Sequence, residues 1–252
     1  MAKTNNSDAT GRSLEYAIVD EFLKGSNIEI DNSTENDQKR DKLKFDSLDS
    51  GLQNRYLKAS VKIVDWCFTT NGIPKGSPMK LRRLTDDEAK QGNVSDIEVI
   101  HDEVKYNYSI KHNHTALKHQ RPGALPQQCG IDKGTEEDKQ YRTEYKNVTQ
   151  SFLNSAKVLK SNAEKFNELK EVDVSFIDDN LYKPVCDLVC NWMNKWGSNP
   201  YNAEYFFRFV VGSTNYDKLV VYNGSVEISE FSDVPAPSKM AVSYTHLRAH
   251  ET

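Results

Sequence analysis

The segment VSDIEVIHDEVKYNYSIK, residues 94–111, decides the fold because apolar and polar side chains alternate in it twice in succession. The first run sets two apolar residues against two acids: Ile97 and Val99 against Asp96 and Glu98. The second run sets four apolar residues against four polar ones: Val104, Tyr106, Tyr108 and Ile110 against Lys105, Asn107, Ser109 and Lys111. A period of two is typical of strands with one buried side, and residues 101–103 form a turn between them. The segment predicts a β-hairpin with Asp96, Glu98, Ser109 and Lys111 on its polar face.

Apolar side chains recur at helical spacing on both sides of this hairpin. We expect helices over 11–24, 52–66 and 86–91 before it, and over 135–169 and 181–196 after it. Strands are expected over 204–211, 218–222 and 226–231. Residues 25–47 are interpreted as a polar loop, and 72–78 as a break. This order predicts an α/β or α+β fold with a mixed central sheet flanked by helices.

The composition indicates a globular protein of one large domain or two small ones, since 37% of the 252 residues are hydrophobic and 28% are charged. No run of apolar residues is long enough to cross a membrane, and the first ten residues lack the apolar core of a secretory signal. The cysteines are too few for a disulfide framework. We therefore expect a cytoplasmic protein with no membrane partner.

The last residues of the chain, 242–252, match in frame the translation of a common transposase sequencing adapter. Such a segment does not take part in the fold. We therefore expect a non-native tail over 242–252, a native part that ends at residue 241, and a natural C-terminus that is missing.

The charge pattern favours an anionic partner, although the net charge of −4 by itself argues weakly against nucleic acid. Residues 66–85 and 104–131 contain no acid but several lysines, arginines and histidines. Two such stretches in an acidic protein predict a local anion-binding surface. Either stretch alone is explained equally well as a solvated loop.

The acid and the lysine of the predicted hairpin suit phosphodiester hydrolysis. A hard cation such as Mg²⁺ prefers carboxylate and water ligands, and it activates water and neutralises the phosphate. A nearby lysine stabilises the charge that develops on the phosphate oxygens. Asp96 on one strand and Ser109-Ile110-Lys111 on the next have the layout of the PD-(D/E)xK nucleases. An acid and a strand lysine alone are a weak signal, because most such pairs are surface charges.

Three segments resemble a more specific family. Residues 109–121, SIKHNHTALKHQR, are similar to the signature of HaeIII-type restriction endonucleases, whose core is S-[IC]-K-H-N-H-x-A-x-K-H-x-R. Residues 11–17, GRSLEYA, resemble the family's N-terminal G-[RK]-x-x-E-Y helix start, and residues 92–96, GNVSD, resemble the segment with its first acid. The resemblance extends from about residue 11 to about residue 231 and is dense only in these places.

The resemblance implies a single endonuclease domain over 1–241 that cuts both strands of double-stranded DNA with Mg²⁺. It further implies a GGCC site and a cognate DNA methyltransferase as functional partner, and we also expect a homodimer. By position, Asp96 is the metal-binding acid, Lys111 the catalytic lysine and Glu15 a carboxylate on a helix that faces the same metal. Ser109 joins the catalytic set where the general motif has an acid. The second metal ligand therefore stays open between Glu15 and Glu98.

The residues that follow the predicted catalytic strand are expected to bind DNA: His112, Asn113, His114, Lys118, His119 and Arg121. Arginine and lysine favour the O6 and N7 atoms of guanine and the phosphates. For a site of G·C pairs, Arg121 and Lys118 are the expected base readers. Asn113 is expected to contact the DNA backbone or to hold the loop.

Two other functions fit parts of the sequence. A zinc hydrolase would use the cluster His112, His114 and His119, because alternate residues of an extended segment lie on one side. A non-catalytic DNA-binding protein, such as a repressor, would use the basic stretches but would have no need for Asp96 and Lys111 at one point. Cys186 and Cys190 are half a metal site at best and are interpreted as core residues.

Overall fold

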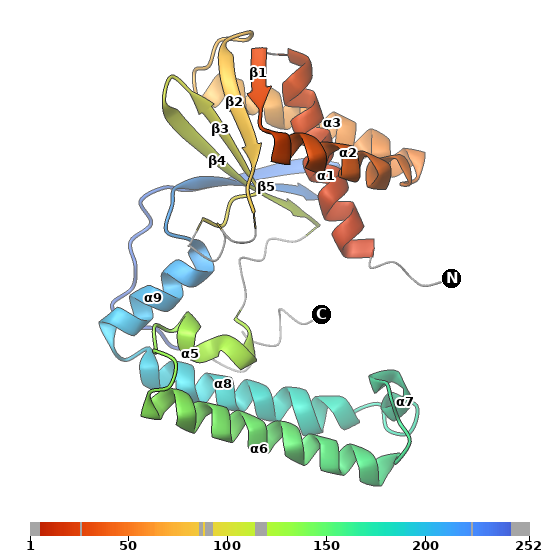
Figure 1. The fold of residues 1–252 in the computed structure, drawn as a ribbon, viewed down its shortest axis with the longest axis vertical. Coiled ribbons are helices and arrows are strands. Elements are labelled where there is room, and N and C mark those ends of the chain that lie inside the picture. Colours follow the sequence, from red (N-terminus) through yellow and green to blue (C-terminus); the bar gives the residue numbers. More distant parts are fainter. Residues whose placement is uncertain are drawn as a thin grey trace. The chain divides into compact units, whose positions relative to one another are not determined.

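The computed structural model describes residues 6–25, 27–85, 88, 93–113, 120–222 and 224–242 of the chain (Figure 1). The chain forms two compact units. The first, here called the sheet unit, comprises residues 1–115 and 212–234. The second, the helical unit, comprises residues 116–211 and 235–252. Each unit has an apolar core of its own. The single endonuclease domain expected over 1–241 stays a prediction.

The described strands of the sheet unit form one six-stranded mixed sheet in the order β1-β2-β3-β4-β5-β6. Neighbours β1/β2 and β4/β5 are parallel and the other neighbours are antiparallel. The mixed sheet flanked by helices that the sequence predicts is therefore confirmed. The strands are β1 (Asn27–Ile30), β2 (Pro78–Arg83), β3 (Ile97–His101), β4 (Val104–His112), β5 (Tyr216–Tyr222) and β6 (Ser225–Phe231).

The predicted hairpin is β3 and β4, paired with Ile97 opposite Tyr108. Its turn residues Asp102 and Glu103 have φ angles of 48° and 67°. Positive φ at both central positions is the backbone of a type I′ turn, whose twist matches that of the flanking strands. The apolar side of the hairpin is buried, and it includes Ile97, Val99, Tyr108 and Ile110. Side-chain alternation therefore leaves Asp96, Ser109 and Lys111 to the opposite side.

Three helices supply the rest of this core: α1 (Asn6–Gly25), α2 (Asn32–Asp46) and α3 (Ser50–Thr70). In Figure 1 they gather beside the sheet near β1 and β2. The apolar stripe of α1, made by Leu14, Ile18 and Phe22, is buried together with the hairpin residues. The helices expected over 11–24 and 52–66 are thus confirmed. Because α1 packs against the hairpin, its residue Glu15 comes close to Asp96.

The loop expected over 25–47 is wrong, since this segment forms β1 and α2. The buried residues of α2 have helical spacing but are mostly polar: Thr34, Gln38, Asp41 and Phe45. Asp31 caps the helix, with its carboxylate accepting the Thr34 N–H at 2.7 Å. A pattern of apolar residues cannot reveal a helix whose buried side consists of hydrogen-bonding groups.

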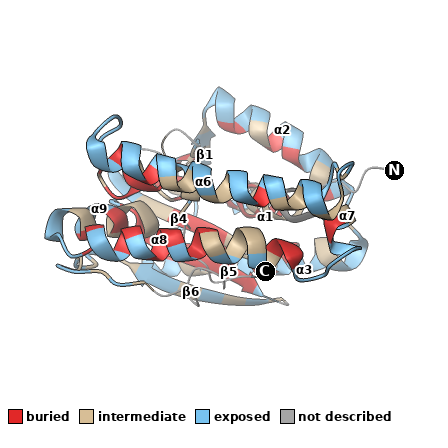
Figure 2. Ribbon diagram, turned by 90° about the horizontal axis from the view of Figure 1, so that it is seen from below, coloured by how far each residue is buried: buried red, intermediate tan, exposed pale blue. Residues whose placement is uncertain are grey.

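The helical unit is built on α6 and α8, which pack through aromatic rings. Trp192 and Trp196 of α8 have their ring centroids 6.0 and 5.8 Å from that of Tyr141 on α6. Figure 2 shows buried residues alternating with exposed ones along both helices. Cys186 and Cys190 are buried in this core, as expected. The described elements of the unit are η1 (Pro122–Ala124), α5 (Leu125–Gln128), α6 (Glu136–Leu159), α7 (Phe166–Lys170), η2 (Asp178–Tyr182), α8 (Lys183–Trp196) and α9 (Pro200–Val211).

The strand expected over 204–211 is also wrong, because this segment lies within the helix α9. Ala203 and Phe206 are three residues apart and buried on one side of it. Short apolar runs do not distinguish a strand from a buried helix. The last two expected strands are confirmed as β5 and β6. The helix expected over 86–91 and the tail over 242–252 fall, except for residues 88 and 242, outside the described residues.

Candidate active site

Asp96 is the centre of a cluster on the β3–β4 hairpin. Its backbone N–H donates to the Tyr108 carbonyl at 2.8 Å, which fixes it beside β4. Its atom Oδ2 accepts the Ile110 N–H at 2.6 Å, the Ser109 hydroxyl at 3.3 Å and the Lys111 ammonium at 3.3 Å. All three donors reach the same oxygen. The carboxylate is therefore fixed through Oδ2.

Ser109 and Lys111 have different surroundings although both contact Asp96. Ser109 is buried, so its hydroxyl orients the acid rather than meeting solvent. The Lys111 side chain is partly exposed, as is that of Asp96. An ammonium group held beside a carboxylate, with part of its surface open, can still donate to an incoming anion. The predicted convergence of Asp96, Ser109 and Lys111 is confirmed.

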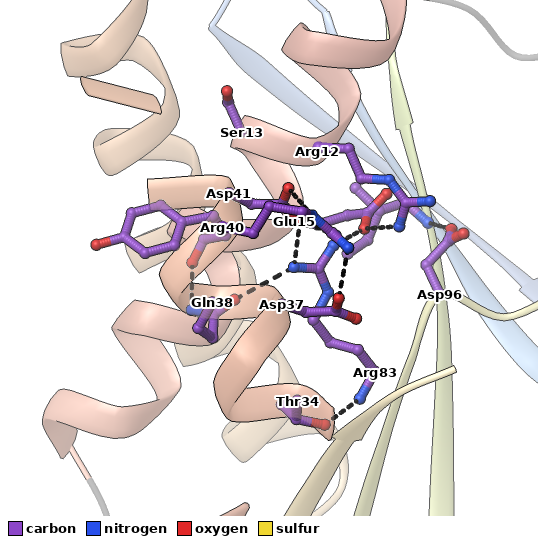
Figure 3. Close-up of polar contacts among 12 residues, drawn as sticks. Arg12, Ser13, Glu15, Thr34, Asp37, Gln38, Arg40, Asp41, Arg83 and Asp96 are labelled. Carbon is purple, nitrogen blue, oxygen red and sulfur yellow. Dashed lines mark hydrogen bonds and ion pairs between the residues drawn. The ribbon is translucent and has the colours of Figure 1, made fainter. Parts of the chain in front are cut away.

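Glu15 reaches the same cluster from α1, as Figure 3 shows. Its side chain is only 14% exposed. Burial raises the pKa of Glu15, the negative charge of Asp96 raises it further, and Arg83 and Arg12 act in the opposite direction. Two neighbouring carboxylates repel each other, and a shared cation relieves that repulsion. Glu15 is thus neither exposed nor remote from Asp96.

Glu98, the other acid of the hairpin, is held by two cations. It accepts the Arg82 Nε–H at 2.7 Å and lies 3.4 Å from the Lys105 ammonium. Its side chain is almost fully buried between them. The charge of Glu98 is therefore balanced by residues of the protein itself.

The first acid-free stretch, residues 66–85, contributes less to an anion-binding surface than the sequence indicates. Arg82 pairs with Glu98 and Glu88, and Arg83 is buried against Asp41. Its two lysines lie against acids as well, Lys75 against Asp65 and Lys80 against Glu29. The acids come from other parts of the chain, and a linear charge pattern cannot show which of them will meet these cations.

Lys218 is a residue of this site that sequence reasoning missed. It lies on β5 directly opposite Ser109 in the parallel β4/β5 register, so both side chains point to the same side of the sheet. Only 5% of Lys218 is exposed. Burial lowers the pKa of Lys218, and the positive charge of Lys111 lowers it further. The signal in the sequence is a single lysine at the start of an otherwise apolar strand, 218–222.

Comparison with known proteins identifies the family of the chain. The chain matches the HaeIII restriction endonuclease family over residues 11–232. It belongs to that family. The chain is therefore a type II restriction endonuclease, a hydrolase of DNA phosphodiester bonds, and not a repressor. No curated protein and no solved structure shows significant similarity to it.

A HaeIII-family enzyme needs a surface for DNA, and some residues expected to contact DNA are described. His112 ends β4 with its ring 5.3 Å from that of Tyr56 in an edge-on contact. Asn113 has a φ of 58°, a region that asparagine tolerates, and its N–H donates to the Val221 carbonyl at 2.9 Å. The Arg121 N–H donates to Gln128 in the helical unit. His114, Lys118 and His119 lie outside the described residues.

Endonucleases of this kind generally use divalent metal ions. Among the described residues, no group of three or more His, Cys, Asp or Glu side chains converges as a metal site. The zinc cluster considered above includes His114 and His119, which fall in the undescribed segment 114–119. None of the described helices is both long and apolar enough to cross a membrane.

Proposed function

We propose that this endonuclease cleaves double-stranded DNA at GGCC with Mg²⁺ held by Asp96 and Glu15. The observation that carries this proposal is the convergence of Ser109, Lys111 and the Ile110 N–H on one oxygen of Asp96. Glu15 adds a second carboxylate from α1. The GGCC site, the methyltransferase partner and the cytoplasmic location follow from the resemblance to the HaeIII type.

The residues at the site fit Mg²⁺. This ion keeps several waters and takes one or two carboxylates together with substrate phosphates, so a cluster of three protein ligands is not required. We favour Glu15 over Glu98 as the second ligand because Arg82 and Lys105 take different oxygens of Glu98, whereas both arginines at Glu15 take Oε2 and the charge of Asp96 acts on Glu15. When bound, the ion would lower the pKa of a water and neutralise charge on the phosphate.

Lys111 has the position for direct contact with the reacting groups. Its ammonium is fixed 3.3 Å from Asp96 and remains partly exposed. From there it can donate to a phosphate oxygen as negative charge develops, or orient the attacking water. The hydroxyl of Ser109 keeps Asp96 in place from the buried side.

DNA recognition is assigned to the last residue of β4 and the residues that follow it. Arg121 and Lys118 are the proposed base readers, because a guanidinium or ammonium group suits the O6 and N7 acceptors of guanine. His112, Asn113, His114 and His119 are proposed to contact the DNA backbone or to shape the loop. The bond from the Asn113 N–H to β5 supports the second role, since it fixes where the loop starts.

A homodimer is part of the proposal. GGCC is palindromic, and a two-fold symmetric dimer presents the same site to each strand. Sedimentation velocity with and without a GGCC duplex tests this expectation. A monomer in both conditions would contradict it.

The function is tested on plasmid DNA. The protein with Mg²⁺ should cut an unmethylated plasmid, and sequenced fragment ends should all fall at GGCC. The same plasmid treated with a GGCC-specific methyltransferase should stay intact, and so should a plasmid from which every GGCC has been removed. Ends at another sequence would overturn the site, and cutting that persists in EDTA would overturn the metal. Cutting supported by Zn²⁺ but not by Mg²⁺ would favour the histidine cluster.

A further inference from the structure

Arg83, at the end of β2, lies in a buried network that leads to the candidate active site (Figure 3). Its side chain is only 1% exposed. Atom Nη1 donates to Asp41 at 2.8 Å, and Nη2 donates to Glu15. The Arg83 backbone N–H donates to the Thr34 hydroxyl at 2.9 Å. The guanidinium group thus bridges an acid of α2 and an acid of α1.

The Asp41 end of this bridge is fixed. The Asp41 side chain has no exposed surface, and Arg40 donates to both of its oxygens, at 2.8 and 2.7 Å. Burial alone would raise the pKa of Asp41, but Arg40 and Arg83 together lower it. A fully buried carboxylate with two guanidinium partners has little freedom to move. Asp41 therefore determines where the Arg83 guanidinium lies.

At the Glu15 end of the bridge, by contrast, the arginine contacts are to one carboxylate oxygen. Both arginines that contact Glu15 bind the same oxygen, Oε2: Arg83 through Nη2 and Arg12 through Nη1 at 3.5 Å. Neither of these two bonds involves the other oxygen, Oε1. The carboxylate is thus held on one side while its charge still acts on Asp96.

We propose that Arg83 is a positioning residue of the active site, which bridges Asp41 and Glu15 so that Oε1 of Glu15 is available for the metal beside Asp96. This inference rests on the proposed role of Glu15 as a metal ligand. Groups that orient a ligating carboxylate in this way typically change metal affinity 10- to 100-fold when they are removed.

The substitution Arg83→Lys tests this role because it keeps the positive charge but loses the planar fork. A lysine has one ammonium group and cannot reproduce two directed bonds to separate carboxylates. The Mg²⁺ concentration for half-maximal cleavage should rise about 10-fold or more. The cleavage rate at saturating Mg²⁺ should stay within a few-fold of the wild-type rate. The rise of the melting temperature on adding Mg²⁺ should shift to higher Mg²⁺ in parallel, which gives a readout other than activity.

Two further variants separate positioning from folding. Lys39→Gln removes an exposed cation of α2 that pairs with Glu35, outside this network, and it should leave the Mg²⁺ requirement unchanged. Asp41→Asn loosens Arg83 from its other end and should raise the Mg²⁺ requirement, by less than Arg83→Lys does. If Arg83→Lys fails to fold, Asp41→Asn provides the test. An unchanged Mg²⁺ requirement in folded Arg83→Lys and Asp41→Asn, or an equal change in Lys39→Gln, would overturn the proposal.

Glu15→Gln distinguishes this proposal from the function on which it rests. If that variant cleaves DNA with a normal Mg²⁺ requirement, the metal-ligand role of Glu15 and the positioning role of Arg83 both fail. If Glu15→Gln loses cleavage and the Mg²⁺-induced rise in melting temperature, while folded Arg83→Lys behaves as wild type, only the positioning role fails.

Discussion

Asp96 is the residue directly before β3, and this position explains how one carboxylate meets three donors. Its backbone pairs with β4, so its side chain lies directly across from Ser109 and diagonally from Lys111. The sequence allowed this much to be predicted, because alternation alone determines which residues share a side of a hairpin. It could not show Lys218 or Arg83 at the site, since their places depend on the pairing of strands far apart in the chain.

Substitution of either central residue should stop cleavage and spare DNA binding. We expect Asp96→Ala and Lys111→Ala each to lower the cleavage rate about 100-fold or more, because both act on the metal or the scissile phosphate. Binding of a GGCC duplex without metal, measured by fluorescence anisotropy, should change little. Asp96→Ala should bind slightly more tightly, since it removes negative charge from the DNA-binding surface.

The matched control for Lys111 is Lys105→Ala. Lys105 lies on the same strand and the same side of it, but its side chain is exposed and pairs with Glu98. Its removal should leave the cleavage rate within a few-fold of wild type. If Lys111→Ala cleaves as fast as this control, Lys111 has no catalytic role.

At the scale of elements, the accuracy of sequence reasoning in the sheet unit followed the chemistry of each buried side. The hairpin and α1 bury apolar residues at regular spacing, and both were predicted. The helix α2 buries Thr34, Gln38 and Asp41, and for that reason it was mistaken for a loop. Its polar side binds Arg83 of β2, so the element that the sequence hid is also the one that supports Glu15.

The cap of α2 should contribute measurably to stability. Asp31 accepts the Thr34 N–H, which otherwise has no partner within the helix. Asp31→Ala should lower the free energy of unfolding by about 1 kcal/mol, whereas Asp31→Ser keeps an accepting oxygen and should lower it by less. Urea unfolding followed by circular dichroism measures both. Equal losses in the two variants would mean that the cap bond is not responsible.

For the molecule as a whole, net charge was a poor guide and local charge a better one. The chain carries a formal charge of −4, yet Lys111 and Lys218 are diagonal neighbours on one side of the sheet. An endonuclease needs positive potential only where DNA binds. Asp217 precedes Lys218 on β5 and lies opposite Tyr108, so its side chain points to the other side of the sheet from Lys218.

Asp217 makes the stability of the protein depend on pH. Burial, together with the nearby charge of Glu230, raises the pKa of Asp217 to about 6. An unfolded aspartate has a pKa of about 3.9, so between these values the folded state binds more protons than the unfolded state. The contribution of this carboxyl to stability therefore falls as the pH rises from about 4 to 6, and it remains unfavourable above that window.

Asp217→Asn should remove this loss of stability at higher pH, because the asparagine amide carries no charge at any pH. The variant should melt at a higher temperature than the wild type at pH 7.5, and the difference should shrink toward pH 4.5, where the wild-type carboxyl is largely protonated. Glu230→Gln should recover only part of the difference at pH 7.5, since it removes the neighbouring charge but not the burial. Melting curves of the three proteins at both pH values measure this. A gain in Asp217→Asn that is equal at pH 4.5 and pH 7.5 would mean that packing, and not the buried charge, is what the substitution changes.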